Sequence, residues 1–217
     1  MRIALVGATG LVGSKVLAEA VERGHGVVAI ARNASKVPVS ESVTAVSADA
    51  EAGIEPGVFE GLDVVVTTFN PGWGVEDLYQ RTLNGQLAIE RSVVAAGVQR
   101  LFVVGGAGSL LAPDGSQLVD GPAFPDAFRP GASAVRDYLT HLRTEAPTGV
   151  TWTFLSPAVE FGNPQVAGRT GQYRVGGDTP VFDAEGRSRI SAEDLAVAIV
   201  DELEQGAHPN QRFTVGY

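Results

Sequence analysis

The 217-residue sequence contains no cysteine, only two lysines, and no apolar run near the ~20 residues that a membrane-spanning helix needs. Without cysteine the fold does not depend on disulfides and requires no oxidising compartment. The N-terminus does not show the charged and then apolar pattern of a secretory signal. These absences predict a cytoplasmic protein that does not enter a membrane.

Acidic residues outnumber basic ones by 25 to 16, and the formal net charge is −9. A phosphate backbone would meet repulsion rather than a basic stripe, so we expect no nucleic-acid partner. No group of His, Asp and Glu has metal-ligand spacing, so we expect no metal site. No linker or charge run divides the chain, which predicts a single domain over residues 1–217.

Apolar segments of strand length alternate with segments of helical periodicity. This alternation predicts an α/β protein with a doubly wound, mostly parallel sheet covered by helices on both faces. Residues 157–190 are rich in Gly, Pro and Asp and predict a small irregular substrate-side insertion. Weak helix signals lie at 33–42 and 50–60. The expected strands are 2–6, 26–31, 43–48, 62–68, 100–105, 151–156 and 212–217, and the expected helices are 11–23, 76–97, 133–145 and 191–205.

The N-terminal strand leads directly into three glycines spaced as G-x-x-G-x-x-G. Gly7 permits the tight turn, Gly10 lets a pyrophosphate approach the backbone, and Gly13 lets the next helix pack closely on the strand. Free N–H groups at the helix start then face the anion. The turn therefore predicts a dinucleotide site, with contacts also from its other members Thr9, Leu11 and Val12.

The residue after the second strand indicates which dinucleotide is bound. An acidic residue there selects NAD, whereas an arginine accommodates the 2′-phosphate of NADP. This chain has Arg32, with further donors in Asn33 and Lys36. NADP(H) is thus favoured over NAD(H), unless Arg32 only begins a solvated loop. Asp49, after the third strand, is either an adenine contact or a simple turn residue.

Ligands of open α/β sheets bind outside the carboxyl ends of the strands. We therefore expect further cofactor contacts after the fourth, fifth and sixth strands, and an acceptor pocket beside them, unless these segments only pack on each other. The cofactor residues expected there are Thr68, Phe69, Asn70, Gly105, Pro157 and Ala158, and the pocket residues are Trp73, Ser109, Phe161 and Asn163.

Several segments together resemble the short-chain dehydrogenase/reductase superfamily. They are the glycine turn 7–13, Arg32, Gly105-Gly-Ala-Gly-Ser109, Thr151-Trp-Thr-Phe-Leu-Ser-Pro157 and Ile190-Ser-Ala-Glu-Asp-Leu-Ala196. The chain is most similar to the atypical branch, which includes NAD(P)H-binding proteins similar to biliverdin reductase B and the NmrA-like redox sensors. The resemblance covers nearly the whole chain and implies a Rossmann-like fold, but it does not identify a substrate.

Catalytic members of that superfamily generally use a Tyr-x-x-x-Lys pair after the fifth strand. This chain lacks the pair, because Leu142 stands four residues beyond Tyr138. Ser109 lies near the position of the superfamily's substrate-polarising serine, although it is equally suited to a local backbone bond. Tyr138 and His141 are three residues apart on one expected helix and form a second candidate for proton transfer, with side-chain packing as the alternative.

A small-molecule acceptor that water protonates readily does not need a strong general acid. The leading hypothesis is therefore an NADPH-dependent reductase acting on a flavin, quinone or carbonyl acceptor without the Tyr-Lys pair. The alternative is a noncatalytic NADP(H)-binding redox sensor of the NmrA-like type. A nucleotide-sugar epimerase or dehydratase is a third hypothesis, weakened by the short chain. The expected helix 76–97 offers a surface for a homodimer.

Overall fold

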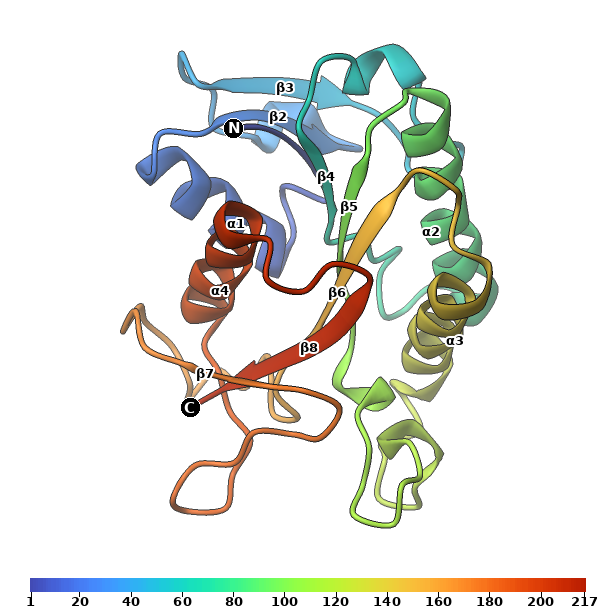
Figure 1. The fold of residues 1–217 in the computed structure, drawn as a ribbon, viewed down its shortest axis with the longest axis vertical. Helices are drawn as coiled ribbons and strands as arrows, with labels where there is room; N and C mark the ends of the chain where they lie inside the picture. The colour runs from blue at the N-terminus through green and yellow to red at the C-terminus, as the bar shows by residue number, and fades with distance from the viewer.

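The computed structural model describes residues 1–217, and its centre is one eight-stranded sheet in the order β3-β2-β1-β4-β5-β6-β8-β7 (Figure 1). The pairings from β3 to β8 are all parallel, and β7 alone pairs antiparallel, with β8. The strands are β1 (Arg2–Val6), β2 (Gly26–Ala31), β3 (Val43–Ser47), β4 (Val64–Thr67), β5 (Arg100–Val104), β6 (Thr151–Ser156), β7 (Arg174–Gly176) and β8 (Gln211–Gly216).

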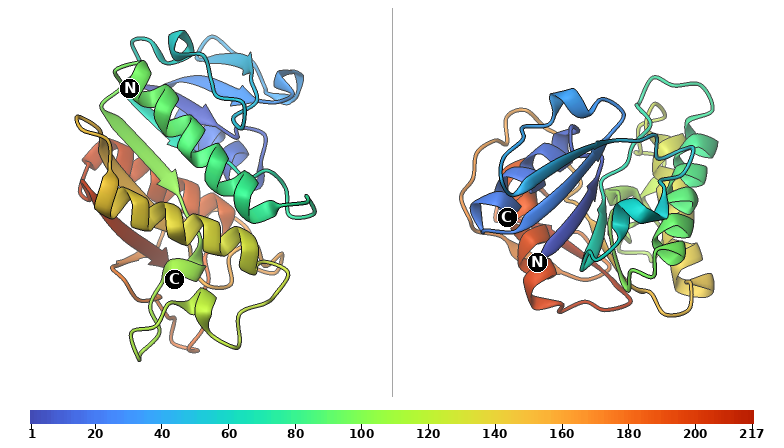
Figure 2. Two further views of the ribbon diagram at one scale, coloured as in Figure 1. Left: turned by 90° about the vertical axis from the view of Figure 1, so that its right-hand side faces the viewer. Right: turned by 90° about the horizontal axis from the view of Figure 1, so that it is seen from above.

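Four α-helices cover the two faces of this sheet. Helices α1 and α4 pack together on one face, and α2 and α3 pack together on the other, where Figure 2 shows them side by side. No helix is both long enough and apolar enough to cross a bilayer. The helices are α1 (Leu11–Glu22), α2 (Leu78–Ala95), α3 (Arg129–Glu145) and α4 (Ala192–Gln205).

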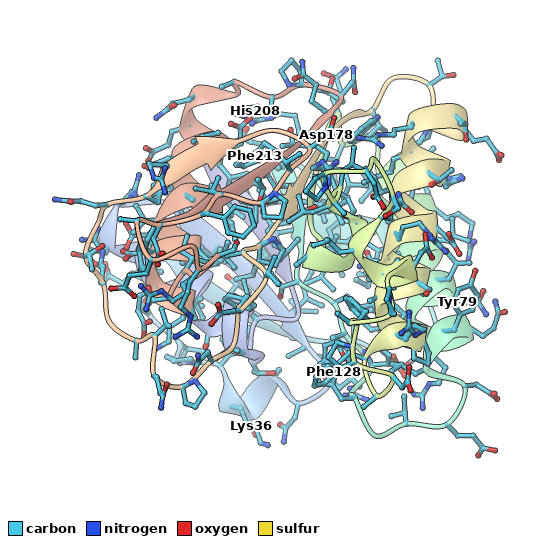
Figure 3. The ribbon with its side chains drawn as sticks, turned by 90° about the horizontal axis from the view of Figure 1, so that it is seen from below. Lys36, Tyr79, Phe128, Asp178, His208 and Phe213 are labelled. Atoms are coloured by element: carbon cyan, nitrogen blue, oxygen red, sulfur yellow. The ribbon has the colours of Figure 1, made fainter.

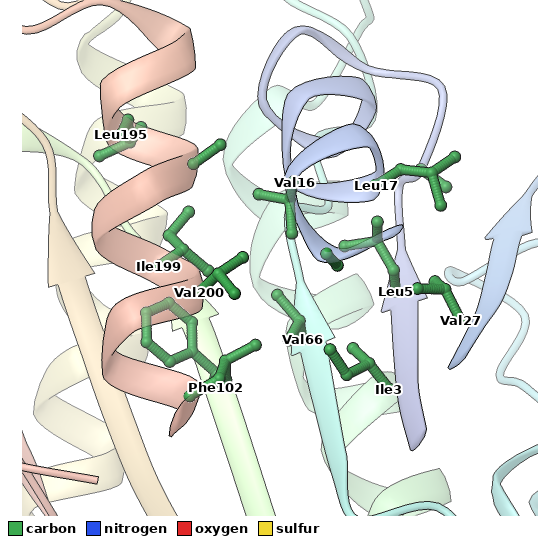
Figure 4. Packing of buried hydrophobic residues seen from close by; sticks show 14 of the residues in the cluster. Ile3, Leu5, Val16, Leu17, Val27, Val66, Phe102, Leu195, Ile199 and Val200 are labelled. Carbon is green, nitrogen blue, oxygen red and sulfur yellow. The ribbon is translucent and has the colours of Figure 1, made fainter. Parts of the chain in front are cut away.

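Burial on both faces explains why the central strands are apolar without alternation. In β1, Ile3 and Leu5 belong to the core beneath α1 and α4 (Figure 4). The intervening Ala4 and Val6 belong to the second core, beneath α2 and α3. Each strand therefore contributes to two separate hydrophobic layers, which together fix its register.

The strand order reverses at β1, whose neighbours are β2 on one side and β4 on the other. Crossovers from β1 and from β4 leave in opposite directions, so the carboxyl ends of these two strands flank a crevice where ligands of open α/β sheets bind. Because the strands are parallel, the loops after β1, β2, β4, β5 and β6 all leave the sheet at this edge; Figure 1 shows those after β5 and β6 at the lower end of the molecule.

The sequence-based expectation of a Rossmann-like α/β fold is confirmed, and the differences are local. Helix α3 begins at Arg129, four residues before the expected start, because Pro130 fits the first turn of a helix. The 33–42 and 50–60 segments contain only the short 3₁₀ turns Ala34–Lys36 and Pro56–Phe59. Strand β7, within the 157–190 segment, was not predicted.

Candidate functional site

The glycine turn after β1 is shaped by close backbone contacts. Gly7 has φ +84°, and a Cβ on it would lie 2.7 Å from the Thr68 hydroxyl oxygen. A Cβ on Gly13 would lie 2.1 Å from the Gly7 carbonyl oxygen, whereas one on Gly10 would meet only that oxygen, at 3.3 Å. Gly7 and Gly13 are thus required by packing inside the protein, and Gly10 has its open side toward solvent.

Helix α1 starts at this turn with Gly10 as its N-cap and without a capping side chain. The first N–H groups of a helix have no intrahelical partner, so those of Leu11, Val12 and Gly13 are free for a ligand. Thr9 and Gly10 are exposed, and Leu11 is 58% exposed although it is apolar. The helix start is therefore open to solvent and uncapped, as an anion-binding helix N-terminus requires.

Thr68 braces the turn from the end of β4. Its hydroxyl donates to the carbonyl oxygens of Val6 at 2.9 Å and Gly7 at 3.2 Å. Phe69 packs against Gly85 of α2, where a Cβ would lie 2.2 Å from the ring. Asn70 is exposed, and its Oδ1 accepts from the backbone N–H of Gly72 at 2.7 Å. Of the expected cofactor residues after β4, Thr68 thus borders the glycine turn, whereas Phe69 lies against α2.

Two exposed cations lie after the end of β2. Arg32 and Lys36 are both exposed and form no salt bridge, and Figure 3 shows Lys36 projecting from the carboxyl edge of the sheet. The neighbouring Asn33 side chain is used locally, because its Oδ1 accepts from the N–H and hydroxyl of Ser35. Arg81, by contrast, is neutralised by two bonds to Glu51, of 2.7 and 2.8 Å.

Asp49 follows β3 on the same edge. Its Oδ1 accepts from the backbone N–H of Glu51 at 3.1 Å, which forms an Asx turn. The carboxylate is exposed and keeps its other oxygen free of hydrogen bonds. Asp49 therefore has a structural role in the turn and still presents an acceptor to the expected adenine position.

The strand ends on the other side of the crevice contribute backbone more than side chains. A Cβ on Gly105 would lie 2.0 Å from the Phe154 ring, so this glycine is needed for packing. Pro157 and Ala158 are buried after β6. Phe161 packs against the core beneath α1 and α4, and the Asn163 side chain accepts from the N–H of Gln165.

Ser109 lies beneath the surface rather than in the crevice. It is 2% exposed, its hydroxyl donates to the Gly106 carbonyl at 3.0 Å, and it lies 3.0 Å from the Ser156 hydroxyl. Its own carbonyl accepts from Arg212. This hydroxyl is therefore engaged inside the protein, as expected for a loop serine that bonds nearby groups.

Tyr138 and His141 do lie together, but at the interface between α2 and α3. The Tyr138 hydroxyl donates to one Glu90 oxygen at 2.9 Å, and the His141 Nε2 lies 3.0 Å from the other. Tyr138 is 1% exposed, and burial together with the Glu90 charge raises its pKa well above the usual value. A buried phenol that donates to a carboxylate joins the helices and is not poised to exchange a proton with a ligand.

The segment after β6 is tied to the helices beside the crevice. Asp194 of α4 is fully buried and accepts from Thr170 N–H at 2.9 Å, Gly171 N–H at 2.8 Å and the Tyr217 hydroxyl at 2.7 Å. The Arg169 guanidinium makes two 2.9 Å bonds to Glu19 of α1. These contacts explain the Asp in the 190–196 motif, which fixes the loop-rich segment.

The crevice rim includes two residues, Phe128 and Arg129, that sequence reasoning missed. Trp73, which was expected as a pocket residue, meets the ring of Phe128 edge to face with centroids 5.0 Å apart. Arg129 donates to the carbonyl oxygens of Val119 and Phe124 in the loop before α3. An aromatic residue directly before Arg-Pro-Gly is the only signal that singles out Phe128 in the sequence.

The segments after the parallel strands combine an open helix N-terminus after β1, two exposed cations after β2 and exposed aromatic side chains after β4 and before α3. These features suit an extended anionic ligand with a ring system at its far end. No group of three or more His, Asp or Glu side chains is placed to hold a metal ion.

Comparisons with known proteins agree with this geometry. Residues 7–206 match the family model described as NAD(P)H-binding. The uncharacterized protein YwnB of Bacillus subtilis (strain 168) is 39% identical over 99% of this chain and 98% of its own length. A crystal structure from Bacteroides thetaiotaomicron, provisionally named an epimerase, is 39% identical with a TM-score of 0.89 over 100% of this chain and 96% of its own.

A second solved structure, from Streptococcus pneumoniae TIGR4, is provisionally named an NADH-flavin reductase. It is 35% identical to this chain, with a TM-score of 0.85 over 100% of this chain and 99% of its own. The family match implies a nicotinamide dinucleotide, and the glycine turn and open helix start fit such a group. The chain belongs to the NAD(P)H-binding family, within the atypical short-chain dehydrogenases/reductases.

Proposed function

We propose that the protein is a cytoplasmic reductase that uses NADPH to reduce a small acceptor. The observation that carries the proposal is the glycine turn at the open start of α1, next to the free cations Arg32 and Lys36. The turn would hold the pyrophosphate on backbone N–H groups, while Thr68 keeps the turn in shape. The bound nicotinamide supplies a hydride, which is the chemistry that the side chains of this chain lack.

The preference for NADPH over NADH rests on charge at the end of β2. Arg32 occupies the position where NAD-selective chains carry an acid, and both Arg32 and Lys36 are exposed and form no salt bridge. A guanidinium grips a phosphate through two parallel hydrogen bonds, which a ribose hydroxyl does not offer. Arg32 and Lys36 would therefore stabilise bound NADPH through its 2′-phosphate, and NADH would gain no such stabilisation.

The kind of acceptor is inferred from the hydrogen bonds of the three residues expected to transfer a proton. Their polar groups are bonded to other groups of the protein, and the residues are Ser109, Tyr138 and His141. In the proposed reaction the acceptor takes a hydride, which carries two electrons, and a proton from water completes its reduction. Flavins and quinones accept a hydride in this way, whereas a nicotinamide-dependent epimerase needs a side chain that takes the proton from the substrate hydroxyl while the hydride leaves the carbon.

The test is consumption of NADPH by the purified protein with riboflavin, a quinone and a small aldehyde, followed as the absorbance of the reduced nicotinamide. The proposal expects decay with the flavin or quinone, faster with NADPH than with NADH. Tight NADPH binding with no decay for any acceptor would contradict it and favour the noncatalytic redox sensor. In that case, different affinities for NADP⁺ and NADPH would be the sensor's signature.

A further inference from the structure

The crevice rim carries an exposed aromatic pair. Trp73 is 55% and Phe128 46% exposed, with ring centroids 5.0 Å apart and planes at 77°. This edge-to-face arrangement is the favourable geometry for two aromatic rings, and it leaves much of both rings open to solvent. Isolated apolar residues are common on surfaces, but two adjacent large rings form a patch that needs an explanation.

The pair is held in place by the surrounding backbone. The indole of Trp73 rests on Gly131 of α3, where a Cβ would lie 3.2 Å from the ring. Gly72 precedes it with φ +121°, in a turn closed by the Asn70 side chain. The two rings are therefore presented on a fixed frame, which reduces the entropy lost when a ligand binds.

Phe128 is fixed from the other side by the residue that follows it. The Arg129 guanidinium donates to the carbonyls of Val119 and Phe124, and it lies 5.7 Å from the centre of the Phe124 ring. The charge of Arg129 is thus used to hold the loop before α3. A preorganised loop that ends in an exposed aromatic residue is suited to recognition rather than to core packing.

Both rings come from segments at the carboxyl edge of the sheet, because Trp73 follows β4 and Phe128 lies between β5 and α3. Trp73 ends the segment that starts at Thr68, whose hydroxyl bonds to Gly7. Phe128 is the N-cap of α3, whose first turn packs against the loop after β5 through Ala132 and Gly108. Figure 3, seen from below, labels Phe128 and Lys36. The aromatic pair therefore joins the segment after β4 to the start of α3.

We propose that Trp73 and Phe128 form the platform on which a planar, conjugated acceptor ring stacks, and that they select such rings over aliphatic carbonyl compounds. This inference rests on the proposed reductase function where it calls the ligand an electron acceptor. The binding of a planar ring to Trp73 and Phe128 does not depend on that function. A flat ring stacks on an aromatic face with little dependence on its substituents, because the attraction comes from area and the π-system. An aliphatic aldehyde gains little there.

Riboflavin is the probe, because it has the planar ring but no phosphate that the glycine turn or Arg32 would bind. Its fluorescence is excited in the visible, where the protein does not absorb, and is titrated with protein without any nicotinamide. Saturable quenching is expected for the unmodified protein. Trp73→Leu and Phe128→Leu should each raise the dissociation constant about tenfold, and Trp73→Phe should restore most of the affinity.

Phe182→Leu is the matched control, since Phe182 is 53% exposed in the loop after β7 and should leave quenching unchanged. If all four variants bind riboflavin as tightly as the unmodified protein does, the platform is overturned. It is also overturned if the unmodified protein sediments as a dimer and Trp73→Leu sediments as a monomer. If Trp73→Leu fails to fold, the riboflavin affinities of Phe128→Leu and Trp73→Phe show whether the two rings bind the probe. If riboflavin quenching requires Trp73 but the protein does not consume NADPH, the reductase proposal is refuted and the platform proposal stands.

Discussion

Gly10 and Gly13 lie in the same turn but should respond differently to one added methyl group. A Cβ on Gly13 would collide with the Gly7 carbonyl oxygen at 2.1 Å, whereas one on Gly10 meets that oxygen at 3.3 Å. Gly13→Ala should therefore lower the free energy of unfolding by ~1–3 kcal/mol or more. Gly10→Ala should unfold nearly as the unmodified protein but bind NADPH at least ~tenfold more weakly, because the methyl group covers the anion site.

Urea unfolding and NADPH titration of both variants check this contrast. Gly57→Ala is the control, because a Cβ added to Gly57 would meet no atom within 4 Å and the φ of this residue is not left-handed. Unchanged stability of Gly13→Ala, or undiminished NADPH binding by Gly10→Ala, would show that the turn is not the tight anion site described above.

Arg32 should set the preference between the two nicotinamide cofactors. Removing its guanidinium leaves a 2′-phosphate without its charged partner, and such hydrogen bonds contribute ~1.5–3 kcal/mol. Arg32→Ala should therefore weaken NADPH binding about 10- to 100-fold and leave NADH binding nearly unchanged. Arg91→Ala, also exposed but on α2, is the control. An equal loss for both cofactors would contradict a contact specific to the 2′-phosphate.

Single residues also show where sequence reasoning reaches its limit. The glycine turn could be predicted because its constraints are local, from Gly7 to Gly13. The burial of Ser109 could not be predicted, because it depends on contacts with Ser156 of β6 and Arg212 of β8, which are far away in the sequence. The position of Phe128 likewise depends on a contact with Trp73, which comes from a loop after another strand.

At the scale of elements, the α2–α3 interface gives a direct test of the role of Tyr138. The ring is buried and its hydroxyl serves Glu90, so Tyr138→Phe should lower the free energy of unfolding by ~1–3 kcal/mol. NADPH-dependent turnover should stay within about twofold of that of the unmodified protein, because no reacting group is removed. A loss of kcat with unchanged stability would instead assign Tyr138 to catalysis.

The elements themselves were predicted to different degrees. β2 and β6 have the expected bounds, because the apolar run of β2 is followed by Arg32 and β6 is followed directly by Pro157, which cannot donate to a ladder. The early start of α3 at Arg129 and the presence of β7 were missed. Helix α3 begins with Pro130 and Gly131, which are typical of loops in isolation, and β7 forms only because β8 offers it an edge.

At the scale of the whole molecule, the buried carboxylates that fix the 168–173 segment predict acid sensitivity. Burial raises the pKa of Asp194, but hydrogen bonds from Thr170, Tyr217 and Gly171 outweigh it, and the net pKa lies below the usual value. The folded state thus binds fewer protons than the unfolded state at low pH. This stabilisation is complete near neutrality and is lost as the pH falls below ~4–5 through the folded-state pKa.

Urea unfolding measured from neutral to acid pH checks this behaviour. Asp194→Asn should lower the free energy of unfolding at neutral pH and flatten its decline in acid, because one acceptor with a depressed pKa is gone. Hydrogen exchange at Thr170 and Gly171, whose N–H groups bond to Asp194, should accelerate in the same variant. An acid decline as steep as in the unmodified protein would contradict the assignment to Asp194.

The central claim is that the open start of α1 and the free cations at the end of β2 together form an NADPH site. Its most direct test is equilibrium titration of the unmodified protein with NADPH and NADH under identical conditions, followed by the fluorescence of the reduced nicotinamide. We expect one site per chain and NADPH affinity at least ~tenfold above that of NADH. Equal affinities, or tighter binding of NADH, would contradict the account.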